Sequence, residues 1–256
     1  KKADVLFIES TYGGRFHPDE VEALPQIEKL VNDTINRGGS LFIPSFSVER
    51  AQLMMLIFWR LLKENKIPKV QMIMDSPMGA NVLELFHRTR DWHRLEDDEC
   101  DKMCSHFTVV SSYRETMELR SDDKPKIVIA GSGMLTGGRM LNYLETQAQN
   151  PDNTLLFVGY QAEGTRGRKL LEGEKEIKVY GKTVSFKMQV AEIEGLSAHA
   201  DHAELLDWLS DIKIQPEKIF IVHGEREGAE ALKQGIKEIY DWDSEVPQLY
   251  GIEELK

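Results

Sequence analysis

Short apolar runs alternate with longer amphipathic stretches along almost the whole chain. The short runs have the length of buried strands, and the stretches between them repeat apolar positions at helical spacing. The predicted strands are Val5–Ile8, Ser40–Ile43, Val70–Met74, Phe107–Val110, Lys126–Ala130, Thr154–Val158, Lys218–Val222 and Gln248–Tyr250, with a hairpin formed by Glu176–Tyr180 and Val184–Glu194. The predicted helices are Pro18–Arg37, Val48–Glu64, Gly138–Gln149, Gly164–Leu171, His202–Leu209 and Glu227–Tyr240. This alternation predicts an α/β fold with a largely parallel sheet, in which residues 91–105 form an exposed loop or helix end.

The charge balance is acidic but uneven. The 256 residues carry 32 basic and 43 acidic side chains, a formal net charge of −11. This balance argues against a nucleic-acid partner, because phosphate backbones select for Lys and Arg. The acidic excess, however, lies mainly in residues 91–125 and 201–256, whereas residues 126–170 carry five basic and three acidic side chains. The glycine-rich middle of the chain therefore remains a candidate for phosphate contact.

Cysteine content and hydropathy indicate the compartment. The chain has two cysteines, Cys100 and Cys104, and no apolar stretch long enough to span a bilayer. Two cysteines do not make a disulfide framework, and the N-terminal residues lack the pattern of a signal peptide. We therefore expect a cytoplasmic protein without a membrane partner.

Three segments place polar residues after predicted strands, where α/β proteins usually have their sites. Glu9 follows the first strand and is either a cap or turn residue or a positioned acid. His199 lies in a small-residue turn before a helix that Ser197 or Asp201 could simply cap. His223 belongs either to a helix-initiating turn or to a metal or catalytic site. An imidazole with a pKa near neutrality suits proton transfer, especially when a carboxylate such as Glu9 orients it.

Two glycine-rich turns, at 130–139 and 159–168, follow strands in the net-positive segment. Each could be a simple turn, but their backbone N–H groups, hydroxyls and guanidinium groups could also hold a phosphate. Neither matches a Walker sequence or a GxGxxG fingerprint, so nucleotide binding has weak support. Two such turns in one segment favour phosphate contact.

The other histidines have less distinctive settings. We interpret His17, His87, His93 and His106 as surface or packing residues, and this interpretation fits His17 least well. Cys100, Cys104 and His106 could together bind a metal ion. The acidic loop between the candidates and the missing fourth ligand argue against such a site.

Seven blocks of sequence, in this order, resemble the β-CASP branch of the metallo-β-lactamase fold from about residue 4 to about residue 228. The blocks are Glu9–Gly13, Pro44–Gln52, Asp75–Met78, Ser132–Arg139, Gly164–Arg168, Ser197–Asp201 and Val222–Glu225. The resemblance implies a β-CASP domain, a parallel sheet flanked by helices, at 14–194. It also implies the C-terminal remnant of a metallo-β-lactamase αββα domain at 1–13 and 195–256.

The resemblance also implies roles for single residues. Glu9 is similar to the family's motif A acid, His199 to its motif B histidine and His223 to its motif C histidine. In the family, the motif A carboxylate holds the motif B histidine, which assists proton transfer, and the motif C histidine binds one of two zinc ions. Members with histidine at motif C generally act on RNA. The residues implied to contact the RNA backbone are Ser132, Gly133, Arg139, Thr165, Arg166, Arg168, Tyr12 and Arg50.

The chain departs from the family in lacking the His-x-His-x-Asp-His zinc cluster. We therefore expect the C-terminal portion of a zinc-dependent ribonuclease, in which His223 is the only zinc ligand retained. Such a portion alone should hold no zinc firmly and should not cut, and its open sheet edge favours a homodimer. The alternatives are a non-catalytic RNA-binding or scaffold module of the same fold and, with less support, a phosphate-ester hydrolase or nucleotide-binding domain without RNA.

Overall fold

The computed structural model describes residues 2–18, 20–96 and 98–255. Within them no helix is both long and apolar enough to cross a membrane. Lys1, Asp19, Asp97 and Lys256 fall inside the predicted domains but lie outside the described residues.

The chain forms two compact units, each with its own core. The larger is Asp19–Leu196, and the smaller joins Lys1–Pro18 to Ser197–Lys256. The domain division at 14–194 and at 1–13 with 195–256 stays a prediction.

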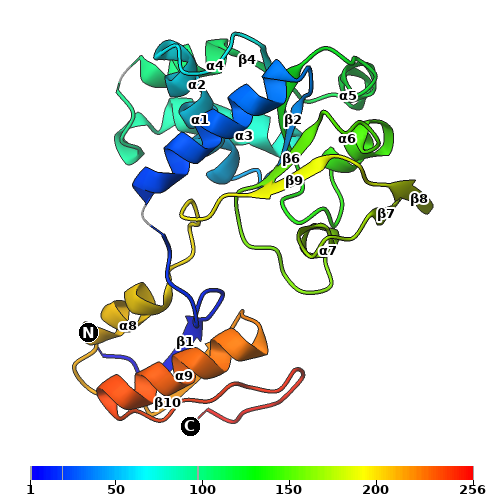
Figure 1. The fold of residues 1–256 in the computed structure, drawn as a ribbon. Coiled ribbons are helices and arrows are strands. Elements are labelled where there is room, and N and C mark those ends of the chain that lie inside the picture. Colours follow the sequence, from blue (N-terminus) through cyan, green and yellow to red (C-terminus); the bar gives the residue numbers. More distant parts are fainter. Residues whose placement is uncertain (1, 19, 97, 256) are drawn as a thin grey trace. The chain divides into compact units, whose positions relative to one another are not determined.

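The larger unit is built on a six-stranded parallel sheet with helices on both faces (Figure 1). Its strands, in the spatial order β4-β3-β5-β2-β6-β9, are β2 (Leu41–Pro44), β3 (Gln71–Asp75), β4 (Phe107–Val110), β5 (Lys126–Ala130), β6 (Thr154–Phe157) and β9 (Gln189–Glu192). Its helices are α1 (Glu20–Asn36), α2 (Arg50–Lys63), α3 (Pro77–Arg88), α4 (Glu99–Ser105), α5 (Tyr113–Leu119), α6 (Met140–Gln147) and α7 (Arg166–Leu171), with a 3-10 turn η1 (Arg90–Trp92).

Adjacent residues of the central strand β2 serve opposite cores of this unit. Ile43 belongs to the core that contains Phe58 of α2. Phe42 belongs to the other core, where its ring centroid lies 5.8 Å from that of Tyr143 in α6. A sheet covered on both faces needs apolar residues at every position of its inner strands. This explains why the strands occur as continuous apolar runs in the sequence.

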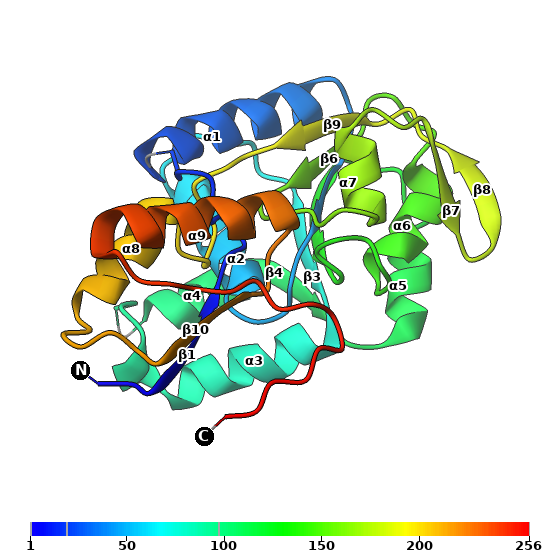
Figure 2. The ribbon, with the colours of Figure 1, turned by 90° about the horizontal axis from the view of Figure 1, so that it is seen from below.

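The smaller unit pairs two parallel strands and covers one face of them with two helices (Figure 2). Its elements are β1 (Val5–Glu9), α8 (His202–Ser210), β10 (Lys218–Val222) and α9 (Arg226–Tyr240). Ile8, Leu209 and Leu232 belong to its core, and each is 5% exposed or less. Because the strands run parallel, their carboxyl ends lie at the same edge.

The predicted hairpin of Glu176–Tyr180 and Val184–Glu194 was wrong for its second strand. β7 (Glu176–Val179) pairs antiparallel with β8, which covers only Lys182–Ser185. The chain then leaves the hairpin because the N–H groups of Lys187 and Met188 both donate to the carbonyl of Ala148. β9 follows and joins the main sheet parallel to β6.

The predicted closing strand Gln248–Tyr250 was also wrong. The backbone that pairs with β10 lies earlier, at Glu245, whose N–H donates to the carbonyl of Ile219 at 2.9 Å. Leu249 and Tyr250 are more than 80% exposed and belong to no strand. Gln248–Tyr250 has no neighbouring strand with which to form backbone hydrogen bonds, so its apolar residues do not make it a strand.

Candidate functional site

The pairing of β1 with β10 brings two polar strand ends together. Glu9 ends β1 and lies opposite Val222, the last residue of β10, and His223 follows directly. Ser10 is fully buried and donates its hydroxyl hydrogen to the carbonyl of Val222 at 3.0 Å. Parallel pairing therefore places Glu9 and His223, which are far apart in the sequence, at one edge.

The loop that carries His199 is fixed by the segment after β1. Asp201 caps α8, as one of the alternatives predicted, and forms a capping box with Glu204. Its Oδ2 also accepts from the backbone N–H of His17 at 2.9 Å, and His17 Nε2 donates to the carbonyl of His199 at 2.9 Å. Tyr12 packs edge-on against His17, with ring centroids 4.4 Å apart. Interpreting His17 as a surface or packing residue was therefore incomplete, because it positions the backbone of His199.

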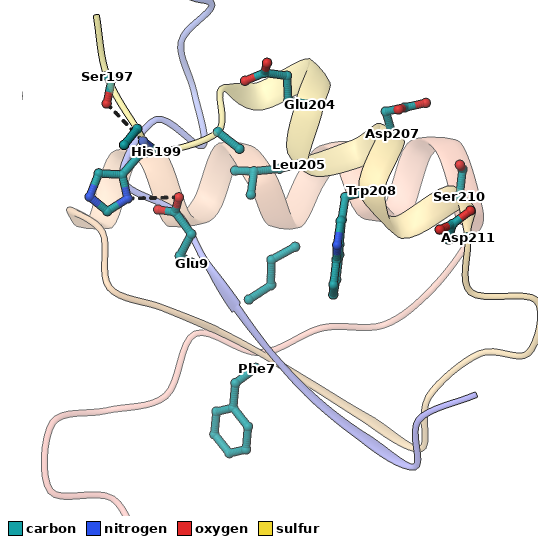
Figure 3. Close-up of a pocket in the computed structure, with 13 residues that line it drawn as sticks. Phe7, Glu9, Ser197, His199, Glu204, Leu205, Asp207, Trp208, Ser210 and Asp211 are labelled. Carbon is teal, nitrogen blue, oxygen red and sulfur yellow. Dashed lines mark hydrogen bonds and ion pairs between the residues drawn. The ribbon is translucent and has the colours of Figure 1, made fainter. Parts of the chain in front are cut away.

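Glu9 and His199 form a hydrogen-bonded pair (Figure 3). Oε1 of Glu9 lies 3.0 Å from Nδ1 of His199, and Oε2 accepts from the N–H of Thr11 at 2.8 Å. Burial opposes ionisation of Glu9, but the hydrogen bonds from Thr11 and His199 outweigh it and lower the pKa of this carboxyl. An ionised carboxylate only accepts hydrogen bonds, so Nδ1 of His199 carries a proton and Nε2 is the ring nitrogen that can take up or release another.

His223 is held in a similar way by Thr11. The Thr11 hydroxyl donates to the carbonyl of His223 at 3.0 Å, and its oxygen lies 3.2 Å from Nδ1 of the same residue. With the hydroxyl hydrogen used, the oxygen accepts from Nδ1, which leaves Nε2 of His223 with its lone pair. Sequence reasoning missed Thr11 as a site residue. Its place in the Glu9–Gly13 block, next to a strand-end acid, was the available signal.

The three groups form one cluster. The rings of His199 and His223 stack with centroids 5.4 Å apart and planes inclined by 25°. Glu9, His199 and His223 each offer a metal-ligand atom, and these atoms lie within 4.8 Å of one another. The arrangement could transfer a proton through His199 and hold a metal ion through His223.

Glu9 and His199 lie at one end of a pocket of about 810 Å³, as Figure 3 shows. Trp208 and Phe7 supply apolar surface farther along it, and both side chains are more than half exposed. This volume falls within the range of about 300–1,000 Å³ typical of ligand sites.

Replacing Asp201 tests how the His199 loop is held. We expect Asp201→Ala to lower the free energy of unfolding by about 1 kcal/mol, whereas Asp201→Asn, which can still cap, should stay close to the parent at neutral pH. Burial raises the pKa of Asp201, but the N–H groups of Glu204 and His17 outweigh it and lower this pKa. A lowered folded pKa adds stability above the ordinary value of 3.8, and this stability is lost as the pH falls through the folded value. Chemical denaturation at pH 7 and below pH 3.8 should show a larger loss in the parent than in Asp201→Asn, because Glu9 and other carboxyls with lowered pKa values titrate in both.

The two glycine-rich turns of the larger unit pack against each other. Nε2 of Gln161 donates to the carbonyl of Gly133 at 3.0 Å, and the N–H of Gly167 donates to the carbonyl of Met134 at 3.3 Å. Gly133 has no room for a side chain, because a Cβ there would lie 2.9 Å from the ring of Phe46. The structure thus brings together the predicted phosphate-binding residues of both turns.

Most polar groups of these turns already have protein partners. Arg166 donates to the carbonyls of Leu135 and Lys178 at 2.7 and 2.6 Å, and Arg168 pairs with Glu172. Thr165 caps α7 by accepting from the N–H of Arg168. A phosphate would compete with these contacts, so the RNA-binding roles of Thr165, Arg166 and Arg168 stay predictions.

Arg139 and Ser132 border a second pocket, of about 520 Å³, in the larger unit. Arg139 donates to the Thr116 hydroxyl at 3.1 Å and to the carbonyl of Ser111 at 3.2 Å. The hydroxyl of Ser132 contacts that of Thr136 and is exposed. Ser132 is therefore more accessible to a ligand than Arg139.

Tyr12 and Arg50 belong to different units. Tyr12 contacts His17 in the smaller unit, and in the larger unit Nη1 of Arg50 lies against Gly159, where an added Cβ would be 2.8 Å from it. Their place in one RNA-binding cleft stays a prediction.

Two family models match parts of the chain. Residues 51–170 match the Beta-Casp domain. Residues 183–247 match the Zn-dependent metallo-hydrolase RNA specificity domain, which includes His199 and His223.

Similar proteins carry related descriptions. The chain is 33% identical over 237 residues to Ribonuclease TTHA0252 of Thermus thermophilus, covering 90% of this chain and 53% of that protein. It is 32% identical over 262 residues to transcription termination factor FttA of Methanothermobacter thermautotrophicus, covering 96% of this chain and 41% of the factor. FttA of Methanosarcina mazei is 30% identical over 248 residues, which are 92% of this chain and 39% of that factor. The chain thus spans about half the length of these relatives or less.

Three observations point to the same family: the order of the sequence motifs, the parallel sheet of the larger unit and the two domain matches. The chain belongs to the β-CASP family of the metallo-β-lactamase fold.

Proposed function

We propose that the chain is part of a metal-dependent ribonuclease and supplies its Glu9–His199 proton-transfer pair and one metal ligand, His223. The observation that carries this proposal is the 3.0 Å contact between Oε1 of Glu9 and Nδ1 of His199, beside the stacked ring of His223. The ribonuclease name of the Thermus relative and the RNA specificity domain support RNA as the substrate.

The donor set fits a metal ion in part. Nε2 of His223 has no hydrogen-bond partner among the described residues, and a neutral imidazole nitrogen is a common zinc ligand. Both oxygens of Glu9 accept hydrogen bonds, from Thr11 and His199, so Glu9 is better suited to orienting His199 than to binding metal. Catalytic zinc has about three protein ligands. Among the clustered residues, His223 would therefore be one ligand of the metal ion, and the remaining ligands would come from outside the cluster.

In this scheme each residue of the cluster has one task. Glu9 accepts from Nδ1 of His199 and so leaves Nε2 to act on the RNA; in the doubly protonated ring Nε2 gives its proton to the leaving oxygen, and the imidazole becomes neutral. Thr11 holds the ring of His223 through Nδ1 and leaves its Nε2 available. When bound, zinc activates water at neutral pH and offsets phosphate charge.

We infer that the larger unit contributes RNA contacts near its two glycine-rich turns. The accessible hydroxyl of Ser132 and the backbone around it support this more than the arginines, whose guanidinium groups have protein partners. Phosphate contacts make affinity fall as salt rises. Binding of labelled RNA should therefore weaken with added salt, and salt-independent binding would count against these contacts.

The metal dependence of RNA cleavage tests the proposed activity. We expect the natural protein, meaning the ribonuclease of which this chain is proposed to be part, to cleave labelled RNA. Cleavage should stop when a chelator removes the metal and should recover when zinc is restored. His223→Ala should hold less zinc than the parent under the same dialysis, because it lacks one ligand. Cleavage that persists after complete metal removal would refute the metal-dependent mechanism. RNA binding without any cleavage would favour the alternative of a non-catalytic RNA-binding module.

A further inference from the structure

A second cluster of potential metal ligands lies in the larger unit, between α3 and α4. It contains His87 from the last turn of α3 and Cys100 and Cys104 from α4. One ligand atom of each lies within 4.8 Å of the others, and Sγ of Cys100 is 3.9 Å from Nε2 of His87. In the sequence, His106 was the histidine considered with the two cysteines, and the acidic loop and the missing fourth ligand argued against that site. In the structure His106 is exposed and contacts Lys102 instead.

The orientation of His87 leaves its Nε2 available. Nδ1 lies 2.7 Å from the carbonyl of Leu83, and a carbonyl only accepts, so Nδ1 carries the hydrogen. Metal-binding histidines usually donate their other ring N–H to a carbonyl or carboxylate in this way. Nε2 is therefore the ring nitrogen left for a metal ion, and it lies 3.9 Å from Sγ of Cys100.

A carboxylate faces the same nitrogen. Oδ1 of Asp101 lies 3.0 Å from Nε2 of His87, while its other oxygen pairs with Arg90 at 3.2 Å. A lone pair and an anionic oxygen at this distance require a cation between them, either a proton or a metal ion. The two sulfurs beside them favour a metal ion that prefers nitrogen and sulfur ligands.

The protein encloses much of this cluster. Cys100 is 1% exposed, and Cys104 is partly buried. Buried cysteines are typically structural rather than reactive.

We propose that His87, Cys100 and Cys104 bind one zinc ion in a structural site that ties α4 to α3, with Asp101 beside His87 but outside the cluster of three ligands. In a tetrahedral site with Zn–S of about 2.3 Å and Zn–N of about 2.0 Å, sulfur and nitrogen ligands lie roughly 3.6 Å apart. The observed 3.9 Å between Cys100 and His87 is close to this value. α4 has only seven residues, too few to be stable as an isolated helix, so a metal tether would add to its packing.

Cobalt substitution tests the site without using activity. The chain contains only two cysteines, so any thiolate-to-cobalt charge-transfer absorption must come from Cys100 or Cys104. We expect reduced protein to take up Co²⁺ with this absorption and with the visible bands of tetrahedral cobalt, and zinc to displace it. Metal bound by His199 or His223 gives no such band, so the result is independent of the proposed nuclease site. Absence of the band with excess Co²⁺ would refute the proposal and leave a proton between His87 and Asp101.

Three variants define the ligands. Cys104→Ser changes a partly exposed residue, so we expect it to fold and to lose most of the charge-transfer band. His87→Gln should bind zinc more than about tenfold more weakly, since loss even of an outer-shell partner costs about 10- to 100-fold. His106→Gln, at the end of the same helix, is the control and should match the parent. An unchanged zinc affinity in His87→Gln would overturn the assignment.

Discussion

Replacing His199 with alanine in the natural protein is expected to slow RNA cleavage about 10²- to 10⁴-fold, the range over which a positioned acid or base contributes. The alanine lacks the imidazole whose Nδ1 contacts Glu9 at 3.0 Å and whose Nε2 is free of partners among the described residues. RNA affinity should change little, because the predicted phosphate contacts lie mainly in the larger unit.

Single-turnover cleavage of labelled RNA measures the chemical step, and a filter-binding assay measures affinity in parallel. His106→Ala removes an exposed imidazole that the described cluster does not contain and serves as the control. Cleavage by His199→Ala at the rate of the control would show that His199 does not transfer the proton.

Gly224→Ala is expected to have the largest effect on the stability of the smaller unit. A Cβ at Gly224 would lie 2.3 Å from Oγ and 2.4 Å from the carbonyl oxygen of Ser10, and both belong to the buried junction of β1 with β10. The preceding His223 has φ of 54°, a left-handed conformation, which leaves the turn little freedom to move away. We expect a loss of about 1–3 kcal/mol in the free energy of unfolding.

Chemical denaturation followed by circular dichroism measures this loss. Gly137→Ala is a matched control, because a Cβ there meets nothing within 4 Å and no left-handed φ is involved. Equal stability of the two alanine variants would mean that the Gly224 turn can relax and that Ser10 does not fix its position.

The pattern of the sequence predicted the strands of the large sheet better than its shorter helices. Lys126–Ala130 agrees to the residue, because a strand buried on both faces is a nearly unbroken apolar run. Phe107–Val110 also agrees to the residue, although β4 lies at the edge of the sheet and its two middle residues are exposed. α4 and α5 have seven residues each, too short for a helical period to show. The start of α3 did carry a signal, since Ser76 caps the helix and Pro77 is its first residue.

The sequence predicted those residues of the candidate site whose positions are set by the ends of strands. Glu9 ends one strand and His223 follows another, and parallel pairing of those strands brings them together. The sequence could not show that the Thr11 hydroxyl would hold His223, because that contact depends on the strand register. It also could not show which arginines are free for phosphate. Arg166, for example, donates hydrogen bonds to the carbonyls of Leu135 and Lys178, which belong to two other segments.

The comparison of Glu9→Gln, His199→Ala and the double variant in single-turnover RNA cleavage tests the central claim most directly. If Glu9 acts by orienting His199, the double variant should cleave no more slowly than His199→Ala alone, because the second change removes a partner that is already lost. Rate losses that multiply in the double variant, or a Glu9→Gln variant as active as the parent, would contradict the proposed pair.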